Sequence, residues 1–438
     1  MEKRKMSVFQ LTIITMVNML GSGIIMLPAK LAAVGSISVL SWLVTLTGAM
    51  SLAYIYARLG TYGHNRKNGM GGYSENTFGK FGNFLINYSY GISLIFANVA
   101  IAVAAVGYGS TFLGWNLSST DIVIWTIVIL LIATFANYWG PRVTGRIGSV
   151  TVWFVIIPVG FIAIFGWFWF SGHTFATSWN PHHLNLWSGI TESVPITLWS
   201  FLGLESAASN SDAVENPERN VPIAVLGGTL AAGIIYILST NVAQGIIGHA
   251  ALAKSNAPFG LVYASILSPF FGKLVMAMMT ISCIGALLGW QFTISENFRV
   301  SAVAGYFPKF FKLVNAHGAP FVGMLTIMII EFILSFMTIN PTLNEQFNQL
   351  VNLAVVLNLV PYLLCMASLK VTEVNQMKLV REVPFHRTTM FIAFVAGIYS
   401  IYSMYACGID ILAAGSLVVF FGMLVYGLIA DRFTGFTL

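Results

Sequence analysis

The stretch MVNMLGSGIIMLP, residues 16–28, decides how the chain folds. It lies in an apolar run of membrane length, which is interrupted by Gly21, Ser22 and Gly23. Backbone groups that leave a helix in lipid have no water to bind, so an unwound segment occurs only where it lines a cavity. We therefore expect a helix broken at residues 21–25, whose freed amides face a binding site. A close crossing of two helices through small residues is the alternative explanation.

The composition places the whole chain in a membrane. Of its 438 residues, 57% are hydrophobic and only 8% are charged, whereas soluble domains carry about 25% charged residues. Hydropathy predicts an all-α polytopic membrane protein with twelve transmembrane helices. The predicted spans are 7–33, 38–60, 82–113, 121–140, 146–170, 190–213, 221–247, 260–298, 322–340, 346–369, 388–407 and 411–430.

The positive charges predict the orientation of these spans. Sorted by side of the membrane, 18 of the 21 Lys and Arg residues fall on the side that carries both termini. Only Lys30, Lys254 and Lys273 fall on the other side. The positive-inside rule then places both termini in the cytoplasm. The three cysteines lie in apolar segments and show neither disulfide nor metal-ligand spacing.

A second interruption matches the first. In TLWSFLGLESAASN, residues 197–210 of the sixth span, Gly203 precedes an acid in apolar surroundings. Interrupted spans at corresponding places in two halves indicate a secondary transporter built from inverted repeats. We expect a first repeat over residues 1–170 with spans one to five and a second over 171–370 with spans six to ten. Residues 371–438 then hold spans eleven and twelve and the C-terminus.

Glu205 is the strongest single candidate for ligand binding. A mid-span acid costs about 2.5–3.5 kcal/mol on insertion scales, and no Lys or Arg is predicted at its depth. A cationic ligand or a proton is the natural partner. Trp199 and Trp290 lie in apolar spans near glycine breaks, and an indole face attracts an ammonium group.

Two further acids lie in or near spans. Glu331 is expected to be protonated or hydrogen-bonded between helices, because its span has no glycine break. Glu296 is expected to form a local ion pair with Arg299.

The sequence resembles a known family over about residues 8–430. MVNMLGSGIIMLPAKLA, GMGGYSE, TLWSFLGLESA, VENPERNVPIAVLGGTL, APFG, LGWQFTI and GYFPKFF are similar to the basic amino acid/polyamine antiporters. These antiporters belong to the amino acid–polyamine–organocation (APC) superfamily, and GMGGY and VNMLGSGIIMLP most resemble the putrescine–ornithine type. The resemblance implies a LeuT-like 5+5 inverted repeat with broken helices 1 and 6. It also implies a substrate site between spans one, three, six, eight and ten.

The resemblance also assigns roles to individual residues. The backbone of residues 21–25 would hold the carboxylate of an amino acid substrate, and Trp199 would stack on its aliphatic chain. Glu205 would bind the amine end and could carry a proton. The substrate-binding positions implied are Gly21, Ser22, Gly23, Ile24, Ile25, Tyr90 as an outer gate, Asn98 for polar groups, Trp199, Glu205, Trp290 as a middle gate, and Tyr426.

Three positions depart from the putrescine–ornithine pattern. Met423 stands where Trp is expected, Leu59 where Cys is expected, and Arg299 where Lys is expected. These departures bear on affinity and on substrate choice.

The implied function is the exchange of ornithine, moving in, for putrescine, moving out, across the bacterial inner membrane. Proton-driven putrescine uptake is a second mode. Alternatives within the family are a lysine/cadaverine antiporter, an arginine/agmatine antiporter and a proton-coupled amino acid/polyamine symporter. Outside it, a neutral amino acid uniporter would leave Glu205 without a cation, and a channel would not need paired broken helices. A non-transporting receptor stays open.

The expected partners are small-molecule substrates and the lipid bilayer. We expect no nucleic acid, metal or cofactor and no catalytic residues, since the sequence lacks a metal motif, a nucleophile elbow and a phosphate loop. The sequence leaves open whether the protein is a monomer or a homodimer.

Overall fold

The computed structural model describes residues 7–21, 23–62, 70–205, 215–337, 339, 342–380 and 387–430. These residues form helices and turns, with no strand among them. The α-helices are α1 (Val8–Leu20), α2 (Leu27–Val34), α3 (Ser41–Tyr62), α4 (Glu75–Leu113), α5 (Ser119–Ala136), α6 (Pro141–Thr151), α7 (Trp153–Phe165), α8 (Gly172–Thr177), α9 (Leu186–Trp199), α11 (Pro217–Ile246), α12 (His249–Ala253), α13 (Pro258–Ile266), α14 (Pro269–Val303), α15 (Phe321–Met337), α16 (Leu343–Val380), α17 (Arg387–Ala406) and α18 (Ile409–Ile429). The 3-10 helices are η1 (Ser36–Leu40), η3 (Met70–Tyr73), η4 (Asn137–Trp139), η5 (Gly166–Trp169) and η7 (Lys309–Lys312).

The long helices have the length and composition of membrane spans. Nine helical segments in the described part of the chain are long and apolar enough to cross a membrane, and α1 and α15 are shorter apolar helices. The prediction of an all-α polytopic protein is therefore confirmed. The exact number of twelve crossings stays a prediction, because the sixth predicted span, 190–213, runs into residues outside the described ranges.

The eighth predicted span, 260–298, differs from the structure. It is divided between α13, which ends at Ile266, and α14, which begins at Pro269. Ser268 between them is extended, with φ −169° and ψ 164°. A proline ring clashes with a helical conformation of the preceding residue, so the helix restarts at the proline.

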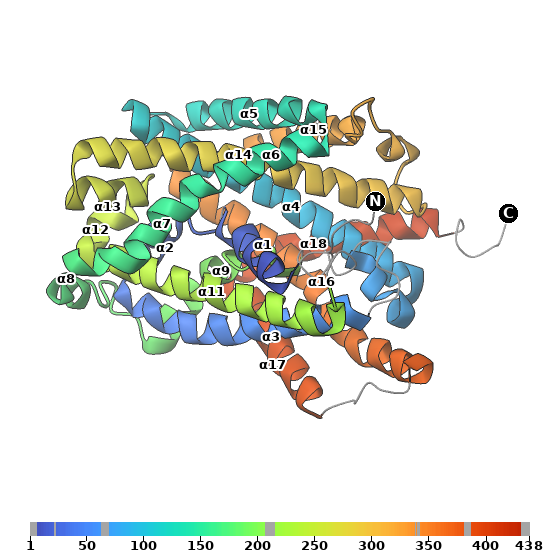
Figure 1. Cartoon of the computed structure of the whole chain (residues 1–438). Helices are drawn as coiled ribbons and strands as arrows, with labels where there is room; N and C mark the ends of the chain where they lie inside the picture. The colour runs from blue at the N-terminus through green and yellow to red at the C-terminus, as the bar shows by residue number, and fades with distance from the viewer. Residues whose placement is uncertain are drawn as a thin grey trace.

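Helix α4 forms the centre of the bundle. Nearly all of its membrane-length stretch is buried, whereas only a small part of α17 and of α18 is buried. It packs chiefly against α16 and α14, and Figure 1 shows α5 and α3 along opposite edges of the bundle. The exposed face of α18 carries large apolar residues such as Phe420 and Leu424. An apolar outer surface of this kind suits contact with lipid.

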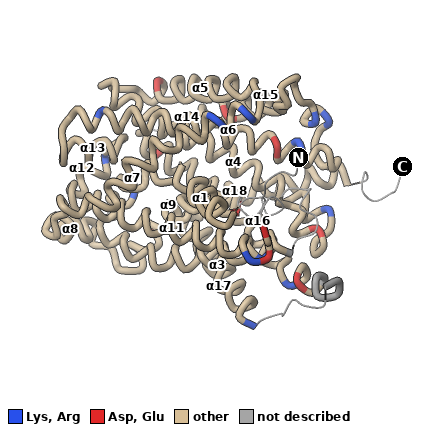
Figure 2. Tube along the Cα trace, in the orientation of Figure 1, with Lys and Arg blue, Asp and Glu red and all other residues tan. Residues whose placement is uncertain are grey.

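The basic residues gather toward one end of the bundle. Figure 2 shows most of the Lys and Arg positions in the right half of the view and few at the left end, which holds α8, α12 and α13. This asymmetry agrees with the sorting of charges by side of the membrane.

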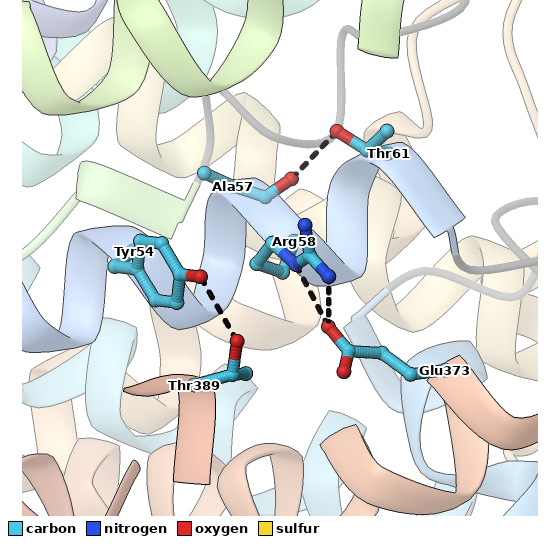
Figure 3. Close-up of polar contacts among 6 residues, drawn as sticks. All are labelled: Tyr54, Ala57, Arg58, Thr61, Glu373 and Thr389. Carbon is cyan, nitrogen blue, oxygen red and sulfur yellow. Dashed lines mark hydrogen bonds and ion pairs between the residues drawn. The ribbon is translucent and has the colours of Figure 1, made fainter. Parts of the chain in front are cut away.

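A buried ion pair joins α3 to α16. Figure 3 shows the Arg58 guanidinium against the Glu373 carboxylate, with Arg58 Nε and Nη2 each 2.7 Å from Glu373 Oε1. The side chain of Glu373 is fully buried, and that of Arg58 is 16% exposed. Nearby, the hydroxyls of Tyr54 on α3 and Thr389 on α17 lie 3.0 Å apart. Polar contacts therefore fasten three helices together here.

Removing either partner of this ion pair should destabilise the fold, and the costs of the two removals should not add. We expect Arg58→Leu or Glu373→Leu to cost up to about 3 kcal/mol, because each leaves a charge without its partner. The double variant should cost less than the sum of the two, since it leaves no unpaired charge. Thermal unfolding of the purified protein in detergent measures the loss of stability in the two single variants and in the double variant. Additive losses would contradict this prediction.

Candidate functional site

The first predicted break is present in the structure. Helix α1 ends at Leu20, and α2 begins only at Leu27, with Pro28 in its first turn. Proline suits the start of a helix because its missing N–H is one that the first turn leaves unpaired. Residues 23–26 between the two helices are buried, with Ile24 and Ile25 fully inaccessible.

The free amides at this break begin later than predicted. The amide of Gly21 still donates to the carbonyl of Val17 at 3.2 Å and so closes α1. Within the described part of the chain, the amides of Gly23, Ile24 and Ile25 donate no hydrogen bond. The expectation of a free amide at Gly21 is thus corrected, because the helix continues for one more bond. Ser22 lies outside the described residues.

The second predicted break also lies where the sequence places it. Helix α9 ends at Trp199, and turns follow to Gly203. Gly203 has φ +106°, a conformation that side chains with a Cβ rarely adopt. Its N–H donates to Glu205 Oε2 at 3.1 Å. The turn that interrupts the helix therefore presents a backbone donor to the buried acid.

The two breaks cross each other at close range. A Cβ placed on Gly23 would lie 2.7 Å from Ser200 Cα and 3.0 Å from the Ser200 carbonyl oxygen. A Cβ on Gly203 would lie 3.3 Å from the carbonyl oxygen of Asn18. In the sequence analysis, a close crossing of two helices through small residues was the alternative explanation for the glycines of the first break. The structure contains both the break and a close crossing. Small residues serve both purposes here, since they unwind the helices and let the backbones touch.

Glu205 is held by three neutral donors. The Tyr362 hydroxyl donates to Oε2 at 2.6 Å and the Tyr90 hydroxyl donates to Oε1 at 3.0 Å, in addition to the Gly203 amide. The acid is 3% exposed and forms no ion pair with any described residue. A buried carboxylate without a cation is costly. The site therefore favours a ligand or proton that supplies positive charge.

Sequence reasoning missed Tyr362 and gave Tyr90 another role. Tyr362 follows Pro361 inside α16, where a phenol in an apolar span needs a polar partner. That signal exists, but it does not identify the partner. Tyr90 was expected to gate the outer side, and the contact that the structure gives its hydroxyl is Glu205.

A small cavity lies between the two breaks. We call it the central pocket; it measures about 20 Å³ and is lined by Gly23, Leu94, Ala97, Ile101, Trp199, Leu202 and Trp290. Its α4 residues continue the helical stripe of Tyr90 at spacings of four, three and four residues. Tyr90, whose hydroxyl donates to Glu205, lies one helical turn before Leu94 on this stripe, and neither Tyr90 nor Glu205 itself lines the central pocket.

Trp290 divides the central pocket from a larger space. This space, the side cavity, measures about 600 Å³ and is lined by residues of α1, α6, α7 and α14, among them Gly21 and Trp290. Trp290 lines both cavities. Trp199 also lines the central pocket, and its Nε1 is buried with no hydrogen-bond partner among the described residues. An unpaired buried donor of this kind is available to a ligand.

Two predicted site residues lie elsewhere. The Asn98 amide donates to Gln291 and Glu331, and Asn98 does not line the central pocket. Tyr426 packs against Phe81 and Phe84, with ring centroids 5.2 and 5.3 Å away. The structure therefore does not bring either side chain to Glu205.

Tyr426 belongs to a separate aromatic cluster with Tyr306. Burial raises the pKa of Tyr306, and the nearby Glu75 carboxylate and Tyr426 add to the rise.

The positions that depart from the putrescine–ornithine pattern also lie apart from the central pocket. Leu59 is buried and Met423 is 37% exposed. Arg299 forms the predicted ion pair with Glu296, which is confirmed by an Nε–Oε2 distance of 2.7 Å.

Comparison with known proteins identifies the family. A model of the family described as amino acid permease matches residues 6–430. The chain belongs to the amino acid permease family. This permease is 55% identical over 434 residues to the putrescine transporter PotE of Escherichia coli K12, with 99% of this chain and 98% of the relative covered. The PotE putrescine transporter of Haemophilus influenzae is 53% identical over 436 residues, with the same shares covered.

A more distant relative is named for different substrates. The cadaverine/lysine antiporter of Escherichia coli K12 is 34% identical over 366 residues, with 82% of each chain covered. The permease family and these relatives confirm the predicted resemblance. The permease is a multi-pass membrane transporter and not an enzyme. Among the described residues, no three His, Cys, Asp or Glu side chains gather as a metal site.

Proposed function

We propose that this permease exchanges ornithine, moving in, for putrescine, moving out, across a bacterial inner membrane. The observation that carries the proposal is Glu205, a buried carboxyl with three neutral donors and no cation among the described residues. Both substrates end in an amine that can supply the missing charge. The names of the two relatives that are more than half identical support putrescine as one substrate.

We propose the topology that the sequence predicts. Twelve crossings form a 5+5 inverted repeat, with residues 1–170 and 171–370 as the two halves and 371–438 as an addition. The interruptions after α1 and α9 support it, since they fall at equivalent places in the two halves. The gathering of basic residues at one end supports cytoplasmic termini.

Each end of the substrate has a partner in the proposed site. The amine end lies toward Glu205, and the aliphatic chain crosses the central pocket between Trp199 and Trp290. The carboxylate of ornithine lies against the free amides of residues 23–25, at the start of α2. Amides at a helix start suit an anion. Putrescine lacks this group and binds without it.

The size of the central pocket implies that its walls move. A space of about 20 Å³ holds about one water molecule, which is far less than a diamine needs. We infer that the Trp290 side chain moves during transport. This movement would join the central pocket to the side cavity and open the substrate site to one side of the membrane. If the site can change its access from one side of the membrane to the other only with a substrate bound, the inward flux of ornithine is coupled to the outward flux of putrescine.

The exchange moves net charge. By their groups, ornithine carries about +1 and putrescine about +2 at neutral pH, so each cycle exports about one charge. Moving that charge against an inside-negative potential costs about 2.3 kcal/mol per 100 mV. The substrate gradients must supply this energy.

A lysine/cadaverine exchanger is the second candidate. The 34% identical cadaverine/lysine antiporter favours it. One methylene separates each lysine-type substrate from its ornithine-type counterpart, and a methylene in a pocket is worth only about 1–3 kcal/mol.

Exchange in vesicles decides between these functions. The purified protein is placed in liposomes loaded with putrescine, and uptake of labelled ornithine is measured against empty liposomes. Uptake that depends on internal putrescine is the expected result. Uptake only with internal cadaverine or agmatine would replace the substrate pair, and amine uptake driven by a proton gradient without exchange would make symport the main activity.

A further inference from the structure

A fully buried acid lies outside the substrate contacts described above. Glu331 in α15 has no exposed surface. Its Oε1 accepts from Asn98 Nδ2 of α4 at 2.9 Å, and its Oε2 accepts from Gln291 Nε2 of α14 at 3.2 Å. Asn98 Nδ2 also donates to Gln291 Oε1 at 2.6 Å. Three side chains from three helices therefore bond to one another in a closed ring.

The ring continues to a fourth helix. Gln291 Nε2 donates to Thr134 Oγ1 of α5 at 3.1 Å, and Thr134 donates to the Leu130 carbonyl at 2.9 Å. Both amide groups then use both of their hydrogens, so Glu331 must accept on each oxygen. A side chain that cannot accept would leave two buried donors unpaired, which is costly.

The described contacts of Glu331 are with neighbouring helices. Its two side-chain hydrogen-bond donors, on α4 and α14, are amides, which do not titrate. Glu331 lines neither the central pocket nor the side cavity. The contacts of Glu331 therefore favour a role in holding helices in place.

The ring lies directly behind the wall of the central pocket. Gln291 follows Trp290 in α14, and Asn98 follows Ala97 in α4. Trp290 and Ala97 both line the central pocket. The bond from Asn98 to Gln291 therefore ties the two walls together, and Glu331 fixes both amides from α15.

We propose that Glu331 is a positioning residue for the substrate pocket. By accepting from Asn98 and Gln291, it sets the spacing between the α4 wall and the Trp290 wall. In so small a pocket, a modest shift of one wall changes substrate contacts. This inference rests on the proposed function, because it takes the central pocket as the place where the amine substrate binds.

The test compares variants that differ in their ability to accept hydrogen bonds. Uptake of labelled ornithine is measured against external concentration in putrescine-loaded liposomes. We expect Glu331→Leu to raise KM about tenfold or more with a maximal rate within about threefold of the parent, because two donors lose their acceptor. Glu331→Gln, which keeps one of the two acceptor oxygens and puts an NH2 against the other donor, should raise KM by less than Glu331→Leu does. Thr326→Leu, which removes a hydroxyl bonded only within α15, is the matched control.

A second variant covers failure of Glu331→Leu to fold. Thr134→Val removes the hydroxyl that receives Gln291 and does not touch Glu331, so it should raise KM by a smaller factor, about threefold. Unchanged KM in both Glu331→Leu and Thr134→Val would overturn the inference. So would a Glu331→Gln variant that keeps exchange but loses proton-driven putrescine uptake, since Glu331 would then carry a proton.

Direct binding separates this inference from the proposed function. Equilibrium dialysis of labelled putrescine with the detergent-solubilised protein needs no transport. If the parent protein binds putrescine but exchanges no substrate pair, the proposed function fails, and weaker binding by Glu331→Leu still supports the positioning role. If exchange succeeds and Glu331→Leu binds like the parent, the positioning role fails alone.

Discussion

The Glu205→Gln variant should lose ornithine–putrescine exchange while keeping its fold. Glutamine has nearly the shape of the acid; its oxygen can accept from one of the two phenols and its NH2 can donate to the other, but it cannot balance an ammonium group. Truncating one partner of a buried charge pair costs about 2–5 kcal/mol, and each 1.4 kcal/mol is tenfold in affinity. We therefore expect amine binding to weaken about 30-fold or more.

Initial uptake rates and putrescine binding measure this loss. Glu192→Gln is the matched control, because it makes the same change at an exposed position of α9. It should leave rates near those of the parent. A thermal midpoint like that of the parent would show that Glu205→Gln is folded. Normal uptake by the folded variant would remove Glu205 from the site.

The phenols around Glu205 allow a graded comparison. Tyr362→Phe removes the shortest of the three bonds to the carboxyl, at 2.6 Å, and leaves the charge in place. A hydrogen bond to a charged group contributes about 1.5–3 kcal/mol, so its effect should be smaller than that of Glu205→Gln. If Tyr362→Phe were the more damaging change, the phenol itself would bind substrate.

The sequence predicts those features that depend on local chemistry. Glycines interrupt both helices where expected, because unwinding in lipid requires small residues and a cavity. Trp199 and Trp290 line the central pocket as predicted neighbours of the breaks. The isolation of Glu205 from cations could also be read from the sequence, since few charged residues exist to pair with it.

Features that depend on how helices rotate against one another could not be predicted. Tyr362 and Glu205 are 157 positions apart, and Arg58 and Glu373 are 315 apart. Spacing within one helix gives a face but not the helix that covers it. For the same reason, Asn98 was assigned to the substrate, whereas its amide donates to Glu331 of α15 and Gln291 of α14.

The Gly23→Ala variant should lose most of its transport activity. The added Cβ would lie 2.7 Å from Ser200 Cα, 3.0 Å from the Ser200 carbonyl oxygen and 3.1 Å from the Met19 carbonyl oxygen. All three are backbone atoms, so no side chain can rotate away. Overpacking of this kind costs about 1–3 kcal/mol, and it forces the two breaks apart. We expect exchange to fall about tenfold or more, with a lower thermal midpoint.

Two glycines provide the controls for this variant. A Cβ on Gly21 would meet only the Val17 carbonyl oxygen at 3.7 Å, which is ordinary contact, and Gly397 in α17 has nothing within 4 Å. Gly21→Ala and Gly397→Ala should therefore fold like the parent. If Gly23→Ala exchanges normally, the breaks can separate without harm, and the glycine is needed for its free amide instead of the close crossing. If it fails while both controls transport, the contact between Gly23 and Ser200 is itself part of the mechanism, because each break then fixes the position of the other.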